Sequence, residues 1–240
     1  MKYITLLSVV IIWHIASIFE FYDTTFFPAP SSVLHQFLED LKTGLFVEDL
    51  IASLKRVSVG FIAAVAIGLP LGLLTFFSKI ANNTVGVLIS ITRPIPPIAY
   101  VPFVVYFMGL GESSKYFLVF IGAVVPIWTT THYSLSQTNK KYIWYGETIG
   151  MNFLEKLRYV YLPANKNALL NGLRIALGIS FYCLIAAEIA GATHGIAYRI
   201  DVSNQVYNVE RMIIGIVSLG FCNYVAQLLL FDISFFRRVS

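Results

Sequence analysis

Long apolar stretches alternate with short polar segments along most of this chain. A helix needs roughly 20 mainly apolar residues to cross the hydrocarbon core of a bilayer. The stretches that reach or approach this length are residues 3–19, 57–77, 85–108, 116–133, 168–192 and 212–231. The pattern therefore predicts an all-α, polytopic membrane helix bundle with six transmembrane helices.

The longest charged and polar segment, residues 139–163, lies between the fourth and fifth apolar stretches. Gly150 is suited to end a first helix there, because glycine adopts the left-handed conformation without a Cβ penalty. Asn152 can cap a second helix, and Glu155 stands three residues later, where a capping box requires a carboxylate. Pro163 is expected to stop that helix, since it has no N–H. Such a helix-turn-helix between two spans predicts a docking surface in the aqueous phase.

A second polar segment, residues 28–52, precedes the second apolar stretch. Ser32 can cap a helix in this segment, and Gly44 can end it. One side of the helix carries three apolar residues, Val33, Phe37 and Leu41. The pattern is typical of an amphipathic helix that lies at a membrane surface. The alternative is an ordinary solvated connector.

The third apolar stretch is interrupted by prolines, in the run Arg93-Pro94-Ile95-Pro96-Pro97. Proline removes backbone donors, so this helix must be broken, and irregular backbone at membrane depth persists only where it is packed in protein or lines a wet cavity. The fifth stretch contains Glu188, a carboxylate that should face the bundle interior, a cavity or a partner subunit. For Arg93 and Glu188 two interpretations stay open: satisfaction by neighbouring helices or carbonyls, or a position on a transport path.

Composition supports a membrane protein, since 57% of the residues are hydrophobic and only 12% are charged. Soluble domains carry about a quarter charged residues. The net charge of +4 is small, and the basic residues flank apolar runs, which favours membrane anchoring over nucleic-acid binding. Cys183 and Cys222 lie inside apolar runs and are expected to be buried free thiols. No small-residue cleavage site follows the first apolar run, which predicts a retained helix.

The distribution of basic residues predicts the orientation of the chain. With both termini in the cytoplasm, nine basic residues lie inside: Lys2, Lys79, Lys140, Lys141, Lys156, Arg158, Lys166, Arg237 and Arg238. Six lie outside: Lys42, Lys55, Arg56, Lys115, Arg199 and Arg211. This orientation puts residues 139–163 in the cytoplasm and residues 28–52 outside it, with Lys55 and Arg56 as its least favourable positions.

The chain shows no pattern for catalysis or for metal binding. The segment from Gly109 to Lys115 lacks the spacing of a phosphate-binding loop. The histidines are scattered, with no metal-ligand spacing and no nucleophile motif beside them: His14, His35, His132 and His194. We therefore expect no catalytic residue, no metal and no bound cofactor. If ATP drives transport of a solute, another chain must hydrolyse it.

Seven short segments follow one another along the chain: residues 28–33, 52–56, 68–72, 93–97, 109–112, 172–178 and 186–188. Taken in this order, they resemble the membrane-spanning subunit of a binding-protein-dependent ABC importer of the nitrate, sulfonate and taurine branch. The family's cytoplasmic EAA loop has a Glu-Ala-Ala start, a glycine and a Leu-Pro end. Gly150 and Leu162-Pro163 match the last two, whereas Trp144-Tyr145-Gly146 replaces the start and Glu147 follows it.

This resemblance implies a single permease domain over residues 1–240, with the type I, methionine-importer-like fold, in the bacterial cytoplasmic (inner) membrane. It implies a second permease copy, two cytoplasmic ATPase subunits that hold ATP and Mg²⁺, and an extracytoplasmic solute-binding protein. The implied ATPase contact consists of Tyr145, Gly146, Glu147, Gly150, Met151, Asn152, Phe153, Leu162 and Pro163. By analogy, Arg93, Pro96, Pro97 and Glu188 line the path of a small anionic solute.

Two rival hypotheses stay open. An ion-coupled secondary transporter would use Glu188 as its carrier site and would need no cytoplasmic ATPase. An integral membrane enzyme or scaffold would require polar residues clustered at one membrane depth, and the sequence shows no such cluster.

Overall fold

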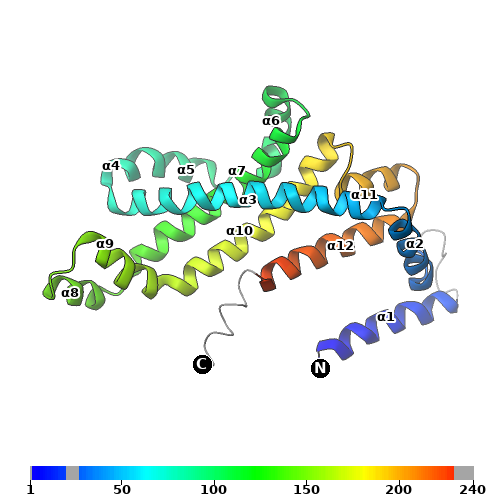
Figure 1. The fold of residues 1–240 in the computed structure, drawn as a ribbon, viewed down its shortest axis with the longest axis horizontal. Coiled ribbons are helices and arrows are strands. Elements are labelled where there is room, and N and C mark those ends of the chain that lie inside the picture. Colours follow the sequence, from blue (N-terminus) through cyan, green and yellow to red (C-terminus); the bar gives the residue numbers. More distant parts are fainter. Residues whose placement is uncertain (1, 20–26, 230–240) are drawn as a thin grey trace.

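The computed structural model describes residues 2–19 and 27–229, and every regular element within these ranges is a helix (Figure 1). The first part of the chain forms α1 (Lys2–Ile18), α2 (Pro30–Lys42), α3 (Leu45–Phe77), α4 (Lys79–Ala81) and α5 (Val87–Thr92), with a π-helical turn over Asn82–Gly86. A 3₁₀ turn over Pro97–Tyr100 leads into α6 (Val101–Met108), which precedes α7 (Glu112–Ser136). The remaining helices are α8 (Lys140–Thr148), α9 (Phe153–Lys156), α10 (Leu162–Gly191), α11 (Ile196–Gln205) and α12 (Val209–Gln227), with a π-helical turn over Leu157–Tyr161.

The helices α3, α7 and α10 form the centre of the bundle, and α7 packs along both of the others. Glycines allow the close approach of these helices. A Cβ atom at Gly60 or Gly72 of α3 would lie within 2.6 Å of Val119 or Thr131 of α7. A Cβ atom at Gly172 of α10 would lie 2.5 Å from Thr130. The three helices are therefore held at short separations along their length.

The six predicted membrane stretches fall on helical structure, apart from the break at residues 93–96 and single residues at the ends of two stretches; residues 230–231 lie outside the described residues. Within the described ranges, four helices are long and apolar enough to cross a membrane: Leu45–Phe77, Glu112–Ser136, Phe153–Gly191 and Val209–Gln227. The third predicted stretch is a fifth candidate, bent by 94° between its two halves. The break predicted at its prolines is therefore confirmed. The first stretch supplies a shorter apolar helix, Leu7–Ile18.

Two predictions for residues 28–52 need correction. The helix α2 begins at Pro30 and has no side-chain cap, so Ser32 is not its capping residue. Proline suits the first helical turn because the N–H that it lacks has no partner there. The spanning helix expected to begin at residue 57 is longer than predicted. It begins at Leu45, directly after Gly44, whose φ of 77° separates it from α2. Of the three residues predicted to form the apolar side of α2, Val33 and Phe37 pack against the hydrophobic core, whereas Leu41 is exposed.

Candidate functional site

The segment predicted as a docking element forms two short helices, α8 and α9, at one end of the bundle (Figure 1). Gly150 has a φ of 73° and follows the end of α8, as predicted. Asn152 caps α9: its Oδ1 accepts from the Glu155 N–H at 3.0 Å, and Glu155 Oε2 accepts from the Asn152 N–H at 2.8 Å. The predicted capping box is therefore confirmed. We call residues 139–163 the loop element below.

The prediction that Pro163 stops the second helix is wrong. The helical segment runs without a break from Phe153 to Gly191, and Pro163 lies in the first turn of α10. The π-helical turn over Leu157–Tyr161 directly precedes it. A π turn has a wider hydrogen-bond pattern, which accommodates the missing N–H of proline. As a result, the second half of the loop element is a direct extension of a spanning helix.

The loop element exposes several large apolar side chains. Each of the following is more than half exposed: Tyr142, Trp144, Tyr145, Ile149, Phe153, Leu154 and Tyr159. A groove of about 470 Å³ lies between α8 on one side and the π-helical turn and first turn of α10 on the other, lined by Tyr142, Tyr145, Gly146, Ile149, Met151, Tyr159, Val160, Pro163 and Ala164. Exposed apolar patches of this kind mark interaction sites. Tyr145 and Gly146, from the segment compared above with the start of an EAA loop, thus line the groove.

The other predicted loop residues take structural positions around this groove. Glu147 accepts from Lys156 Nζ at 3.2 Å and so links the two helices. Gly146 is buried, and a Cβ atom there would lie 3.3 Å from Met151 Sδ. Leu162 is partly exposed at the start of α10. The structure therefore gathers the predicted residues into one compact element.

Aromatic rings connect the loop element to the end of α3. The ring of Phe153 lies 4.7 Å from that of Phe77, and Tyr161 lies 5.3 Å from Phe77 and 5.5 Å from Phe76. Phe76 also contacts His132 of α7 edge to face, at 6.4 Å. Sequence reasoning missed these contacts, because it assigned Phe76 and Phe77 only to the end of an apolar stretch. We call these five rings the aromatic cluster.

Hydrogen bonds tie α7 to its neighbours near the same end. Trp128 donates through Nε1 to Thr75 Oγ1 of α3 at 2.9 Å. Asn165 of α10 donates through Nδ2 to Thr138 Oγ1 at 2.7 Å and to the Tyr161 carbonyl at 2.9 Å. Both Thr138 and Asn165 are buried. Movement of the loop element is therefore resisted by polar bonds as well as by ring contacts.

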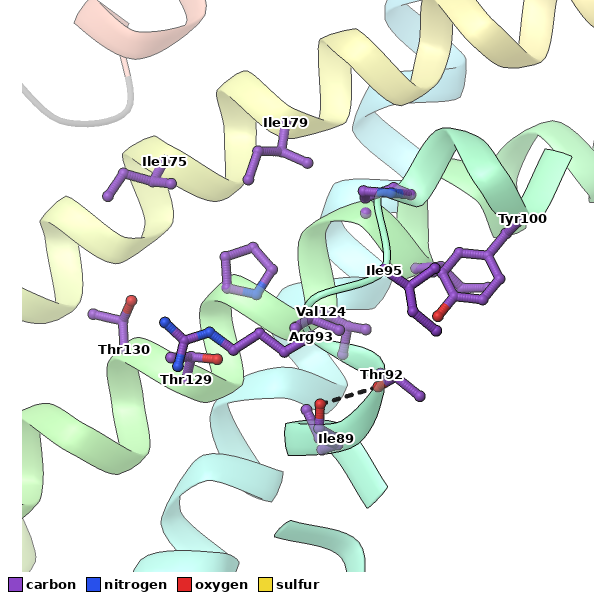
Figure 2. Close-up of a pocket in the computed structure, with 15 residues that line it drawn as sticks. Ile89, Thr92, Arg93, Ile95, Tyr100, Val124, Thr129, Thr130, Ile175 and Ile179 are labelled. Atoms are coloured by element: carbon purple, nitrogen blue, oxygen red, sulfur yellow. Dashed lines mark hydrogen bonds between the residues drawn. The ribbon is translucent and has the colours of Figure 1, made fainter. Parts of the chain in front are cut away.

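A cavity of about 570 Å³ lies where the bent third stretch meets α7 and α10 (Figure 2). Two of the predicted path residues, Arg93 and Pro97, line it, whereas Pro96 is not among the lining residues. Figure 2 shows the Arg93 side chain extending toward Thr129 and Thr130 of α7, which line the same cavity. We call this space the Arg93 cavity.

Glu188 does not line the Arg93 cavity; it lies near the end of α10 that is far from the loop element. The residue is fully buried. Its Oε1 accepts from Ser53 at 2.7 Å and from Arg56 Nη1 at 2.8 Å, and its Oε2 accepts from the Ala197 N–H at 2.8 Å. Both carboxylate oxygens are therefore satisfied by neighbouring helices, which is one of the two interpretations that the sequence left open.

Arg56 joins Glu188 to the start of α7. Only 1% of its side chain is exposed, and it donates to both carboxylate oxygens of Glu112 at 2.7 and 2.8 Å. It also donates to the His194 carbonyl at 2.7 Å. Since Arg56 is buried and paired, it does not count among the free basic residues from which the membrane orientation was predicted. Asp49, Ser53, Arg56 and Glu188 are buried, and Glu112 and His194 are more exposed at their edge; together we call these six residues the buried polar network.

The buried polar network also caps α11. The N–H groups at the start of this helix donate to side chains of α3 and α10: Gly195 to Asp49 at 2.7 Å, Ile196 to Ser53 at 2.9 Å, and Ala197 to Glu188. These donors have no partner inside their own helix, so carboxylates from elsewhere in the fold stabilise them. The network is therefore a structural junction of α3, α7, α10 and α11.

Among residues 2–19 and 27–229, no group of three or more His, Cys, Asp or Glu side chains is arranged to hold a metal ion. The described residues thus form an exposed apolar surface on the loop element, the Arg93 cavity and the buried polar network.

Comparisons with known proteins agree with this architecture. Residues 60–234 match the model of the family described as binding-protein-dependent transport system inner membrane component. An ABC transporter permease protein of Methanocaldococcus jannaschii is 32% identical over 221 residues, which cover 90% of this chain and 82% of that protein. The taurine transport system permease protein of Escherichia coli is 26% identical over 229 residues, covering 93% and 83%. An inward-facing structure of the MetNI methionine ABC transporter shares the fold, with a TM-score of 0.66 at 23% identity over 79% of this chain and 94% of that one.

Proposed function

Because the chain belongs to the family of binding-protein-dependent transport system inner membrane components, and is the permease subunit of an ABC importer in the nitrate, sulfonate and taurine branch, we propose that its loop element couples the bundle to a separate cytoplasmic ATPase. Its fold is that of type I importer permeases such as the one in MetNI. The proposed ATPase binds ATP and Mg²⁺, and this chain binds neither.

One observation carries the coupling proposal. The segment Phe153–Gly191 is a single helical segment, so a load applied to α9 acts directly on the spanning helix α10. The groove next to α8 exposes apolar side chains, and exposed apolar patches commonly mark interaction sites. A cytoplasmic subunit that fills this groove would move α10 when it closes on ATP. The proposed contact residues are Tyr145, Gly146, Glu147, Gly150, Met151, Asn152, Phe153, Leu162 and Pro163.

We propose two copies of this chain in the importer, each seated on its own ATPase subunit, with a solute-binding protein on the outer face. In this arrangement both termini and the loop element lie in the cytoplasm. The buried pairing of Arg56 supports the orientation, since it removes one of the two least favourable charges from the outer count. The membrane is the bacterial cytoplasmic (inner) membrane.

The proposed translocation path includes the Arg93 cavity, with Pro96 and Pro97 forming its broken backbone. A guanidinium beside this cavity favours a small anionic solute, as the name of the taurine permease also suggests. Glu188 is left outside the path, because both its oxygens are occupied by protein donors. For the same reason, the structure offers no support for an ion-coupled transporter that uses Glu188 as a carrier.

Co-purification tests the ATPase contact. The full chain, extracted in mild detergent from the host that expresses its neighbours, should bring an ABC ATPase with it. Replacing Tyr145 with Asp places a charge in the groove and should release the ATPase, while Tyr207→Asp, in the exposed turn between α11 and α12, should not. Recovery of the chain with no ATPase, or equal recovery with the Tyr145 variant, would contradict the proposal.

A further inference from the structure

Arg93 is the cationic side chain of the Arg93 cavity, and its guanidinium has no partner in the described structure. Its backbone N–H completes the last turn of α5, bonding to the Ile89 carbonyl at 2.9 Å. No hydrogen bond or ion pair within residues 2–19 and 27–229 involves its side chain. A guanidinium presents five N–H donors in a planar fork, so this side chain is free to receive an anion.

Two threonines on the facing wall also leave their hydroxyl groups unused. Thr129 Oγ1 is buried and has no hydrogen-bond partner, and no hydrogen bond in the described structure involves the hydroxyl of Thr130. The next residue behaves differently: Thr131 donates to the Ile127 carbonyl at 2.8 Å, as threonines in helices commonly do. Residues 129 and 130 line the cavity, whereas Thr131 faces Gly72 of α3.

The rest of the cavity wall is mainly apolar, and its other polar side chains are Thr92, whose hydroxyl donates to the Ile89 carbonyl at 3.0 Å, and Tyr100. Its side chains come from α5, the broken segment, α7 and α10, and include Ile89, Ile95, Ile121, Val124, Ile175 and Ile179. An unbonded polar group in such surroundings costs free energy, unless a ligand satisfies it. The Arg93 guanidinium, Thr129 and Thr130 lie together on one side, while Ile95, Tyr100 and Thr92 lie on the other (Figure 2).

We infer that Arg93, Thr129 and Thr130 form a subsite for the oxyanion head of a small alkyl-bearing anion, of the alkanesulfonate class. The guanidinium and the two hydroxyls supply donors to the three oxygens, and the isoleucine walls take the alkyl chain. This inference rests on the proposed function and deepens it, since it names the head group, the tail and the residues that select them. It also separates alkyl sulfonates from bare oxyanions such as nitrate, which could not use the apolar walls.

Direct binding to the purified full-length chain tests the subsite without any ATPase. Titration calorimetry in detergent would compare butanesulfonate, ethanesulfonate and nitrate. The wild-type chain should bind butanesulfonate more tightly than ethanesulfonate, and both more tightly than nitrate. Thr129→Val combined with Thr130→Val should weaken butanesulfonate binding about tenfold, the effect of losing a hydrogen bond to a charged group. Arg93→Gln should abolish measurable binding.

Thermal stability distinguishes this role from a structural one. Because the Thr129 hydroxyl has no partner in the ligand-free protein, Thr129→Val should keep or raise the melting temperature. Thr84→Val is the matched control: its hydroxyl bonds to the Ile80 carbonyl, away from the cavity, and butanesulfonate binding should be unchanged.

Three results would overturn the subsite: no binding of butanesulfonate by the wild-type chain, equal binding by the valine variants, or preference for nitrate over both sulfonates. Co-purification of an ATPase in the separate extraction from the native host would then leave the importer function standing, so the two failures can be told apart.

Discussion

Arg56 of α3 and Glu188 of α10, which are 132 positions apart in the sequence, form an ion pair at 2.8 Å, and both side chains are almost fully buried. The pair lies at the end of the bundle opposite the loop element, where it joins α3 to α10 and, through Glu112, to α7. A buried charge without its partner is costly, so the two residues depend on each other.

The first prediction concerns this dependence. Arg56→Gln and Glu188→Gln should each lower the stability of the detergent-solubilised protein, by on the order of 3 kcal/mol, because each leaves a buried charge with fewer partners. The double variant should lose clearly less than the sum of the two. Thermal unfolding of the three variants measures this coupling. Strictly additive losses would show that the pair is not the stabilising contact.

The same variants bear on the rival transport mechanism. If Glu188 carried a proton or an ion, Glu188→Gln would abolish transport and leave the melting temperature unchanged. We expect the opposite result for Glu188→Gln: the melting temperature should fall, and uptake should fall only in proportion to the folded protein that is lost.

A second prediction follows from Gly195, which has a φ of 129° beside the Glu188 carboxylate. A Cβ atom here would lie 2.5 Å from three carboxyl atoms of Glu188. Gly195→Ala should therefore destabilise the protein by about 1–3 kcal/mol, through backbone strain and displacement of the carboxylate. Gly178→Ala, at a position in α10 with no atom within 4 Å of the new Cβ, should be neutral or stabilising by up to about 1 kcal/mol. Equal melting temperatures for both variants would refute the strain.

A third prediction concerns the aromatic cluster, which joins the loop element to α3. Phe77 contacts both Phe153 and Tyr161, and such ring pairs contribute about 0.5–1.5 kcal/mol each. Phe77→Leu keeps the side chain apolar but removes the ring contacts, so movements of the loop element should reach α3 less effectively. In vesicles containing the assembled importer, uptake per ATP hydrolysed should fall several-fold.

The control for this experiment is Phe103→Leu, on the exposed surface of α6 and far from the loop element. It removes an equivalent aromatic ring and should leave the ratio of uptake to ATP hydrolysis as in the wild type. A normal ratio in the Phe77 variant as well would mean that the aromatic cluster does not transmit the movement.

Local features of the fold could be predicted from the sequence, because adjacent residues determine them. The capping box of Asn152 and Glu155, the left-handed Gly150 and the break after Arg93 all depend on residues within a few positions of one another. The prediction for Pro163 failed because spanning helices tolerate proline where local adjustments of the backbone satisfy the groups that it leaves unbonded. Here a π-helical turn precedes Pro163, and Pro70 and Pro126 likewise lie inside α3 and α7.

Contacts between distant segments could not be read from the sequence. Arg56 was interpreted as a charge flanking the membrane, because nothing near it in sequence indicates Glu188 or Glu112 as partners. The unused hydroxyls of Thr129 and Thr130 were likewise invisible, since only the fold shows that they face Arg93 while Thr131 bonds to its own helix. Residues 230–231 of the last predicted span lie outside the described residues.

The last prediction concerns Gly150, at the turn between α8 and α9. Its φ of 73° lies in the left-handed region, which costs a β-branched residue about 1–2 kcal/mol or more. Gly150→Val should therefore reorient α8 against α9 and separate Tyr145 from Tyr159 across the groove. Uptake should be lost, while membrane insertion and the fold of the spanning helices remain. Gly150→Asn is the matched control, because asparagine tolerates this conformation and should retain uptake. The space around the residue is open, so the two variants differ in backbone preference and not in steric overlap. Normal uptake in the valine variant would argue strongly against the loop element as the point where ATP hydrolysis acts on the bundle.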